Sequence, residues 1–319
     1  MNILFVGMRF NNYELKIKEE FEKQGHSVDL IYDTPKSYIV PVKFLSKNFI
    51  QKKNYEYQER ILIKINNRNY DVLFILVGRN LSESFLKNVK KENTKIVLYL
   101  WDDVARVENF ELLQKYSDII ISFDKEDCSK YGFTFLPLFY LNDFYQENSD
   151  SPKKYDIYGV YWNHSDRLRI IDSIIKQSCG KSLFFYVLVG KIFFLRTLPK
   201  KKTVIHFSFR SMSYRENVKN MKDSKAILDI QFPSQHGLTI RTIEALGTGC
   251  KVITTNESVK QYDFYNPQNI LIIEREHPVI DWAVLDSPYQ KIDENIRRKY
   301  SVTNWVKCVL KIQKKLLEK

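Results

Sequence analysis

Apolar and polar positions along the chain form a repeating pattern of short buried strands and amphipathic helices. Apolar runs of strand length occupy Asn2–Val6, Ser27–Tyr32, Asp71–Val77, Lys95–Trp101 and Asp118–Phe123. Between them, helical spacing predicts helices over Tyr13–Gln24, Phe49–Asn66, Ser82–Lys90 (with Ser82 as the cap) and Phe110–Lys115. Strands with near-continuous apolar runs that alternate with helices indicate a parallel sheet covered on both faces.

A second series of the same kind begins at Tyr155. Its expected strands are Tyr155–Tyr161, Ser182–Val189, Thr203–Phe207, Ala226–Gln231, Lys251–Thr255 and Asn269–Ile273. Helices are expected over Ser165–Lys176 and Tyr214–Met221, after Thr239, and in the tail from about Ile292. We therefore predict two doubly wound α/β domains, at residues 1–140 and 155–290. A linker would occupy residues 141–154, and residues 291–319 would form a C-terminal helix that could cross back to the N-terminal domain.

The charge balance points to a negative partner. The 319 residues carry a formal net charge of +12. Nucleic acid, an anionic membrane face and phosphorylated substrates all fit such a charge, and so does a Lys-rich surface that serves only solvation. Two basic segments, Lys36–Lys53 and Arg196–Lys202, are candidates for contact with anionic lipid headgroups.

Cysteine usage and hydropathy favour a cytoplasmic protein. Its four cysteines, Cys128, Cys179, Cys250 and Cys308, form no CxxC pair. The N-terminus resembles a strand and lacks the basic start of an export signal. The longest strongly apolar run, Leu183–Gly190, is well short of the roughly 20 residues of a spanning helix.

Several familiar chemistries lack their motifs. The chain has no GxxxxGK[ST] phosphate loop, no GxGxxG around Gly7, no HExxH and no plausible cysteine–histidine zinc cluster. It also lacks a DxD triplet, because Asp102 and Asp103 are adjacent. We therefore expect no bound metal.

One stretch, His236–Asn256, has the pattern of a loop, a helix, a glycine turn and a strand. Thr239 is a suitable N-cap, and Gly247 and Gly249 are expected to end the helix. Arg241 has the wrong charge for the first turn of a helix, which favours a role in binding an anion. Glu244 lies on the same side one turn later. The alternative is a structural turn in which Arg241 pairs with an acid.

Residues 232–256 resemble the donor-nucleotide unit of GT-B glycosyltransferases of bacterial polysaccharide synthesis, related to the group 1 and CgeB-like families. The resemblance implies a GT-B fold, in which two Rossmann-like domains face a central cleft. It implies a nucleotide-sugar donor, with a UDP-sugar favoured, a cell-surface glycan or lipid-linked acceptor, and no cofactor beyond the donor itself. The donor-binding residues implied are Gly237, Leu238, Thr239 and Arg241 for the diphosphate and its loop, and Glu244 for the ribose.

The first glutamate of the pair found in many group 1 enzymes is replaced by His236. The retaining mechanism associated with the full pair is therefore not implied. His236 is a catalytic candidate near the donor sugar or phosphate, and equally a residue that sets the loop.

Asp102 and Asp103 are the candidates for the catalytic base. They follow a predicted buried strand, so they should lie at the carboxyl edge of the N-terminal sheet, where a carboxylate can take the proton of an acceptor hydroxyl. The alternative is that one of them caps the next helix.

Further polar groups are expected at strand ends. Gly7, Arg9, Gly78 and Arg79 are candidates for the acceptor side, and Asn163 and Arg167 are candidates for a second anion site on the donor side. The alternative for Arg9 and Arg79 is that they are ordinary surface arginines.

Two other functions remain open. A catalytically inactive GT-B-like protein would bind the donor without transferring the sugar. A nucleic-acid-binding protein would explain the net charge and the interleaved aromatic residues, although nucleic acid is not the expected partner. We expect a glycosyltransferase in the cytoplasm that could be held at the inner face of the membrane.

Overall fold

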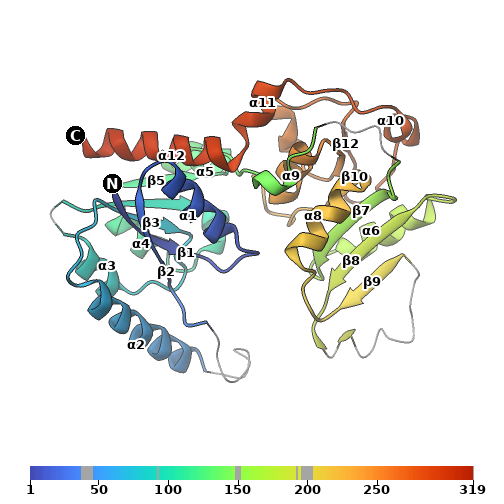
Figure 1. Ribbon diagram of the computed structural model, residues 1–319. Helices are drawn as coiled ribbons and strands as arrows, with labels where there is room; N and C mark the ends of the chain where they lie inside the picture. Colours follow the sequence, from blue (N-terminus) through green and yellow to red (C-terminus); the bar gives the residue numbers. More distant parts are fainter. Residues whose placement is uncertain (37–45, 92, 148–151, 192, 195–203, 319) are drawn as a thin grey trace. The chain divides into compact units, whose positions relative to one another are not determined.

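The structure is a computed structural model that describes residues 1–36, 46–91, 93–147, 152–191, 193–194 and 204–318. The chain forms two compact units, traced in Figure 1. The first contains Met1–Pro137 and Val302–Lys319, and the second contains Leu138–Ser301. The C-terminal helix therefore belongs to the same unit as the N-terminal strand.

The first unit is built on a six-stranded parallel sheet with the order β2-β1-β3-β4-β5-β6. Its strands are β1 (Asn2–Gly7), β2 (Ser27–Tyr32), β3 (Val72–Leu76), β4 (Lys95–Leu100), β5 (Ile119–Ser122) and β6 (Thr134–Phe135). All five residues of β3 are buried, as the continuous apolar run predicts for a strand covered on both faces.

The helices of the first unit are α1 (Tyr13–Lys23), α2 (Lys47–Ile65), α3 (Glu83–Val89), α4 (Phe110–Tyr116), α5 (Lys125–Tyr131) and α12 (Val302–Leu317), with a short 3₁₀ helix, η2 (Val104–Arg106). The predicted cap of α3 is confirmed, because Ser82 Oγ accepts a hydrogen bond from Phe85 N at 3.2 Å. Helix α5 was not predicted. It buries none of its residues, so its sequence has no apolar period.

The core of the first unit depends on α12, which runs alongside α1 (Figure 1). The indole of Trp305 is 1% exposed. Its ring centroid lies 4.8 Å from that of Tyr99 on β4 and 6.1 Å from that of Phe74 on β3, both in edge-to-face geometry. The apolar stripe of α12 therefore covers the middle of the sheet.

The second unit has its own six-stranded parallel sheet, with the order β12-β11-β10-β7-β8-β9. Its strands are β7 (Tyr155–Trp162), β8 (Leu183–Leu188), β9 (Ile205–Ser208), β10 (Ser224–Asp229), β11 (Lys251–Thr254) and β12 (Ile270–Ile272). The predicted class, two Rossmann-like doubly wound α/β domains, is confirmed.

The helices of the second unit are α6 (Arg167–Lys176), α8 (Tyr214–Lys222), α9 (Ile240–Thr248), α10 (Trp282–Asp286) and α11 (Glu294–Lys299), with the 3₁₀ helices η3 (Asn142–Phe144) and η5 (Glu257–Gln261). Phe144 on η3 is fully buried, and η3 contacts α8 and α9. Residues 142–144 thus pack as part of the second unit, and residues 148–151 lie outside the described residues.

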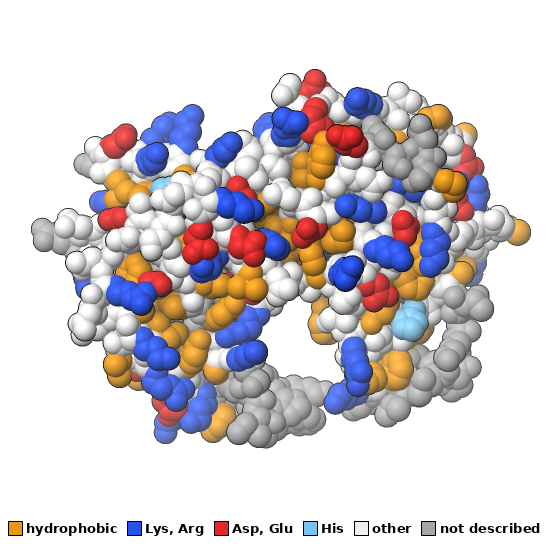
Figure 2. Space-filling view, viewed as in Figure 1, with side chains coloured by type: hydrophobic (Ala, Val, Ile, Leu, Met, Phe, Trp, Pro, Cys, Tyr) orange, Lys and Arg blue, Asp and Glu red, His pale blue; other side chains and the backbone are white. Residues whose placement is uncertain are grey.

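The predicted basic surface is only partly described. Arg196–Lys202 lies outside the described residues, as do residues 37–45. Helix α2 carries Lys47, Lys52 and Lys53. Figure 2 shows Lys and Arg side chains gathered at the lower left, where Figure 1 places α2. None of the described helices is long and apolar enough to span a membrane.

Candidate functional site

The carboxyl edge of a doubly wound sheet binds ligands beside the point where the strand order reverses. That point lies between β1 and β3 in the first unit and between β7 and β10 in the second. Six of the predicted residues lie at or just after the ends of these strands: Gly7, Arg9, Gly78, Arg79, Asn163 and Arg167. Each unit therefore places its candidates at the carboxyl edge of its own sheet.

Helix α9 begins after Thr239, as predicted. Thr239 Oγ1 accepts a hydrogen bond from Arg241 N at 3.2 Å, and Gly249 ends the helix in the left-handed region with φ 68°. The prediction that Gly247 also ends the helix is wrong, because Gly247 lies inside α9. A Cβ atom at Gly247 would come within 2.7 Å of the Tyr140 ring, so this glycine permits close packing rather than a turn.

Asp229, at the end of β10, is a site residue that the motif did not reveal. It is 3% exposed, and its Oδ2 accepts hydrogen bonds from Thr239 Oγ1 and Thr242 Oγ1, each at 2.8 Å. Burial raises the pKa of Asp229, against the opposing effects of the two hydroxyls and of Arg167 and Arg241. The available signal was a lone carboxylate in an apolar strand, which is rare unless it is paired.

Arg241 lies across the end of β7. Its Nε donates to Val160 O at 3.0 Å, and its NH1 lies 3.4 Å from Glu244 Oε2. Glu244 is 2% exposed, so the pair is largely removed from water. The structure thus contains the acid pairing that was the alternative explanation for Arg241. The same contacts fix the guanidinium at the strand ends.

Arg167, the first residue of α6, reaches the same place. Its Nε donates to Ile230 O at 2.9 Å, and its NH1 donates to Trp162 O at 3.3 Å. The guanidinium carbon lies 5.7 Å from the ring centroid of Tyr161. Burial lowers the pKa of Arg167 to about 10, so the side chain is still a cation at neutral pH. Arg167 and Arg241 therefore place two guanidinium groups at the ends of β7 and β10.

Asn163 lies in the loop that follows β7. Its backbone N donates to Leu188 O at 2.9 Å. The neighbouring ring of His164 lies 5.3 Å from the ring of Phe232, centroid to centroid. This contact joins the loop after β7 to the loop after β10, on the two sides of the reversal point.

Arg275, which follows β12, is a third arginine at this edge and was not among the predicted residues. Its NH1 donates to Asp166 Oδ1 at 2.6 Å, and its NH2 donates to Gln231 O at 2.5 Å. These contacts tie the loop after β12 to those after β7 and β10. No motif in the sequence marks Arg275.

The loop before α9 is held by Asn256. Asn256 Nδ2 donates to His236 O and to Gly237 O, each at 3.2 Å. The His236 residue is exposed, whereas Leu238 is 2% exposed and has its side chain in the interior of the second unit. The predicted roles of these three loop residues in donor binding stay predictions.

In the first unit, Asp102 lies between two arginines. It forms an ion pair with Arg79, and Arg106 NH1 lies 3.5 Å from its Oδ1. The Asp102 side chain is 20% exposed. The predicted acceptor-side residue Arg79 and the candidate base Asp102 are therefore in direct contact.

Asp103 differs from Asp102 in its burial and in its partners. It is 8% exposed, and neither carboxylate oxygen has a hydrogen-bond partner among the described residues. Burial raises the pKa of Asp103. Although Asp103 precedes η2, it makes no side-chain cap, and Asp127 Oδ2 accepts the hydrogen bond from Val104 N at 2.9 Å. The expectation that Asp102 or Asp103 caps this helix is thus wrong for Asp103.

The remaining acceptor-side candidates have partners within the first unit. A Cβ atom at Gly7 would come within 2.9 Å of Glu14 Cβ, and Gly78 has a φ of 68°. Arg9 NH1 donates to Thr34 O at 2.8 Å, and its guanidinium lies 3.8 Å from the ring centroid of Tyr32. Internal packing and backbone geometry thus account for both glycines. An acceptor role for these residues stays a prediction.

A groove of about 710 Å³ opens beside Arg79 in the first unit. Its walls come from the first half of α2, from the loop after β3, and from the segment before α4. The lining residues are Lys47, Ile50, Gln51, Asn54, Tyr55, Arg79, Asn80, Leu81, Ser82, Glu108 and Asn109. It is a candidate acceptor surface because it continues from the carboxyl end of β3.

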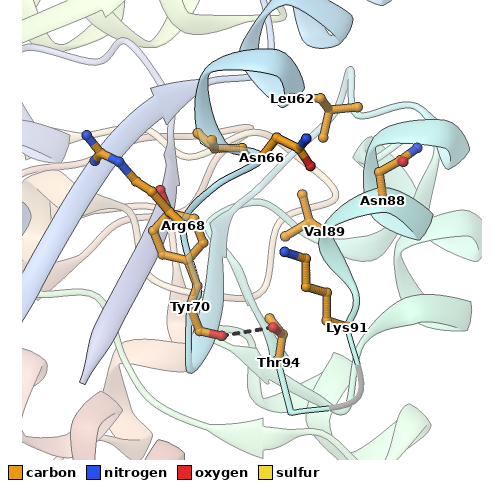
Figure 3. Close-up of a pocket in the computed structure, with 9 residues that line it drawn as sticks. Leu62, Asn66, Arg68, Tyr70, Asn88, Val89, Lys91 and Thr94 are labelled. Carbon is orange, nitrogen blue, oxygen red and sulfur yellow. Dashed lines mark hydrogen bonds between the residues drawn. The ribbon is translucent and has the colours of Figure 1, made fainter.

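A smaller pocket, of about 50 Å³, lies at the opposite edge of the same sheet. Figure 3 shows it between the end of α2, the end of α3 and the residues that precede β3 and β4. Thr94 Oγ1 donates to Tyr70 O at 2.8 Å in its wall. Its size and its place at the amino ends of the strands argue against a substrate site.

Among the residues that the structure describes, no group of three or more His, Cys, Asp or Glu is placed to hold a metal ion. The side chains of Arg167 and Arg241 supply positive charge at the candidate donor site.

Comparison with known proteins shows the fold. No protein-family model matches this sequence, and no curated protein matches it. Among solved structures, the chain is similar to AviGT4, a glycosyltransferase involved in avilamycin A biosynthesis. The TM-score is 0.67 at 11% identity, and the match covers 100% of this chain and 98% of the other.

Two further structures are similar over nearly the whole chain. The lipopolysaccharide outer core galactosyltransferase WaaB has a TM-score of 0.59 at 12% identity, with 97% of this chain and 98% of the other covered. The UDP-GlcNAc 2-epimerase of Methanocaldococcus jannaschii has a TM-score of 0.58 at 12% identity, with 98% and 99% covered. Together with the two parallel sheets, these similarities confirm the predicted GT-B type of two-domain Rossmann-like fold.

Proposed function

We propose that this chain is a glycosyltransferase that moves a sugar from a nucleotide-sugar donor to an acceptor hydroxyl without a bound metal ion. One observation carries the proposal. Two guanidinium groups, those of Arg167 and Arg241, are fixed on backbone carbonyls at the reversal point of the second sheet. Cations held in place before the donor binds stabilise a diphosphate leaving group with little reorganisation.

The donor would be held from phosphate to ribose along α9. The N-terminal turn of α9, capped by Thr239 and held by Asp229, offers backbone N–H groups and the positive end of the helix dipole to a phosphate. Glu244, one turn further, would accept hydrogen bonds from the ribose hydroxyls. A UDP-sugar is the favoured donor.

Asp102 is the favoured base of the two candidates. Its side chain is partly exposed at the carboxyl edge, whereas both carboxylate oxygens of Asp103 are enclosed. A base must come within hydrogen-bond reach of the acceptor hydroxyl. Replacement of Asp102 by Asn should therefore reduce turnover by about 10²-fold or more, the contribution typical of a positioned base.

The acceptor would be a glycan or a lipid-linked sugar of the cell surface, bound along the groove beside Arg79. Lysines of α2 would keep the protein close to anionic headgroups on the cytoplasmic face of the membrane. Binding to vesicles with and without phosphatidylserine, at low and at physiological salt, measures this part of the proposal. Equal binding to neutral and anionic vesicles would contradict it.

The donor is identified by a thermal-shift panel of UDP, GDP, dTDP, CMP and their sugar derivatives. A ligand that binds only the folded protein raises the melting temperature. Arg241→Ala and Arg167→Ala should each abolish most of the shift and leave the circular dichroism spectrum unchanged. Arg298→Ala is the matched control, because Arg298 is an exposed arginine of the same unit. If the nucleotide raises the melting temperature of both arginine variants as much as that of the wild type, the two arginines do not bind the donor phosphates.

Product analysis separates the alternatives. A transferase forms a new glycosidic bond to the acceptor and releases the nucleotide. Without an acceptor, it releases the nucleotide only if water attacks the donor sugar in the acceptor's place. An epimerase would convert UDP-GlcNAc to its C2 epimer without an acceptor, an outcome worth testing because a UDP-GlcNAc 2-epimerase shares the fold. Donor binding without either product would favour an inactive binding protein.

A further inference from the structure

Trp162 is an exposed aromatic residue in an unusual place. It is the last residue of β7, and its side chain is 63% exposed, the highest fraction among the exposed aromatic residues that the structure describes. Its neighbour Tyr161 is 3% exposed. Leaving an indole in water forgoes the favourable burial of a large apolar surface. The position therefore leaves a large apolar surface at the strand end available to a ligand.

Both site arginines are attached to the same end of β7. Arg241 Nε donates to Val160 O, and Arg167 NH1 donates to Trp162 O. A ligand that binds the two guanidinium groups through its phosphates would thus lie within about two residues of Trp162 along the strand, roughly 7 Å at a rise of ~3.3 Å per residue.

The order of groups along the strand end gives the ligand a direction. Arg241 is paired with Glu244, which lies deeper on α9. Arg167 is held by the carbonyl of Trp162 itself. If Glu244 meets the ribose, a diphosphate that runs from Arg241 to Arg167 brings the group beyond its second phosphate to Trp162. In a nucleotide-sugar, that group is the sugar.

We propose that Trp162 stacks against the sugar ring of the bound donor and helps to determine which sugar is accepted. The inference rests on the proposed function and adds a residue outside the motif. One face of a pyranose ring presents mainly C–H groups. An indole covers such a face and removes both surfaces from water. Sugars that differ by an axial hydroxyl on that face should be discriminated.

Binding measurements on paired ligands test the assignment. Isothermal titration compares UDP with UDP-glucose, UDP-galactose and UDP-GlcNAc, or GDP with GDP-mannose if the thermal-shift panel selects guanine. Trp162→Ala should weaken the best nucleotide-sugar by about tenfold, the loss expected for one stacking contact. It should change the affinity for the bare nucleotide less than about twofold. Trp162→Phe should restore most of the affinity. Phe209→Ala, a matched exposed aromatic of the same unit, should have no effect.

Fluorescence supplies an independent readout. The chain has four tryptophans, of which Trp101 and Trp305 are buried. Acrylamide should therefore quench Trp162 strongly, and the nucleotide-sugar should protect it more than the bare nucleotide does. Trp162→Phe should remove the protected component.

The outcomes are distinguishable. Unchanged affinities in Trp162→Ala would overturn the inference, and so would an equal loss for nucleotide and nucleotide-sugar, which would place the nucleobase on the indole. Both results leave the proposed function intact. If the wild-type protein binds no nucleotide, the proposed function itself fails, and the inference fails with it.

Discussion

Two buried aspartates show how hydrogen-bond donors offset the cost of burying a carboxyl group in this protein. Asp229 accepts hydrogen bonds from two threonine hydroxyls at the end of β10. Asp103 has no hydrogen-bond partner among the described residues. Burial disfavours the charged form of both, but only Asp229 has donors that offset part of that cost. The two residues therefore give opposite predictions for mutation.

The stability advantage of Asp103→Asn over the wild type, measured as the free energy of unfolding, should grow as the pH rises. The folded-state pKa of Asp103 is raised by burial. The wild-type protein therefore loses stability between the unfolded-state pKa, near 3.9, and the higher folded-state pKa, as the carboxyl group ionises. Asparagine cannot ionise. Urea unfolding from pH 4 to pH 7 should show a growing difference between the two proteins.

Glu111→Gln is the control for that series, because Glu111 is an exposed carboxylate of the same unit. A constant difference between Asp103→Asn and wild type across this pH range would contradict the assignment of a raised pKa to Asp103.

Thr242→Val should destabilise the second unit. The substitution keeps the shape of the side chain and removes one of the two hydrogen bonds to Asp229, which leaves a buried carboxylate less satisfied. The cost of such a loss is about 1–3 kcal/mol in the free energy of unfolding. Thr242→Ser keeps the hydroxyl and should recover most of the stability. A free energy of unfolding in Thr242→Val equal to that of the wild type would contradict the contribution of this hydrogen bond.

At the scale of elements, α9 illustrates two uses of glycine within three residues. Gly249 ends the helix in a left-handed conformation, and Gly247 lets the Tyr140 ring pack directly on the helix backbone. Gly249 is required by its own backbone conformation. Gly247 is required by the packing of Tyr140, about a hundred positions away in the sequence.

Gly247→Ala and Gly249→Ala should therefore differ in cost. An alanine at Gly247 forces the Tyr140 ring to move, which costs about 1–3 kcal/mol, as overpacking typically does. At Gly249, alanine retains a positive φ at a cost of about 1 kcal/mol. Thermal unfolding measures both. The substitution Tyr140→Leu, combined with Gly247→Ala, should reduce the first penalty and leave the second unchanged.

The elements that were predictable are those with a continuous apolar run or an apolar period. The strand β3 is a continuous apolar run, the helix α9 has apolar positions at helical spacing, and both were predicted. The polar helix α5 and the two-residue strand β6 have no such period and were not. The parallel sheets followed from the alternation of strands and helices, because few other arrangements bury such strands on both faces.

The site was predictable only where the sequence carries a local signal. Thr239 was identified as a cap from its place before an apolar helix, and the structure confirms it. Asn256 and Arg275 became apparent only from long-range contacts, with partners between 19 and 109 positions away in the sequence. Contacts of that kind depend on the sheet order, which a local pattern does not contain.

At the scale of the whole molecule, the first unit consists of two segments separated by the entire second unit. Trp305 supplies the second segment's largest contribution to the core, between the rings of Tyr99 and Phe74. The stability of the first unit should therefore depend on a residue that is remote in sequence from its sheet.

Trp305→Ala should destabilise the first unit by about 3–5 kcal/mol, the usual cost of removing a buried aromatic side chain. Hydrogen exchange followed by mass spectrometry resolves the two units. Faster exchange is expected in β3 and β4, with β10 and β11 unchanged. Increased exchange in both units to the same extent would show that they unfold as one cooperative body.

The return of α12 to the first sheet also constrains the order in which the protein can fold during synthesis. The ribosome adds about 5–20 residues per second, and domains generally fold as their sequences emerge. Residues 138–301 are complete before α12 exists, so the second unit has all its parts before the first does. Until Trp305 has been added, the apolar sheet face that it covers stays open to chaperones and to other nascent chains. The unit that begins first is thus the one that finishes last.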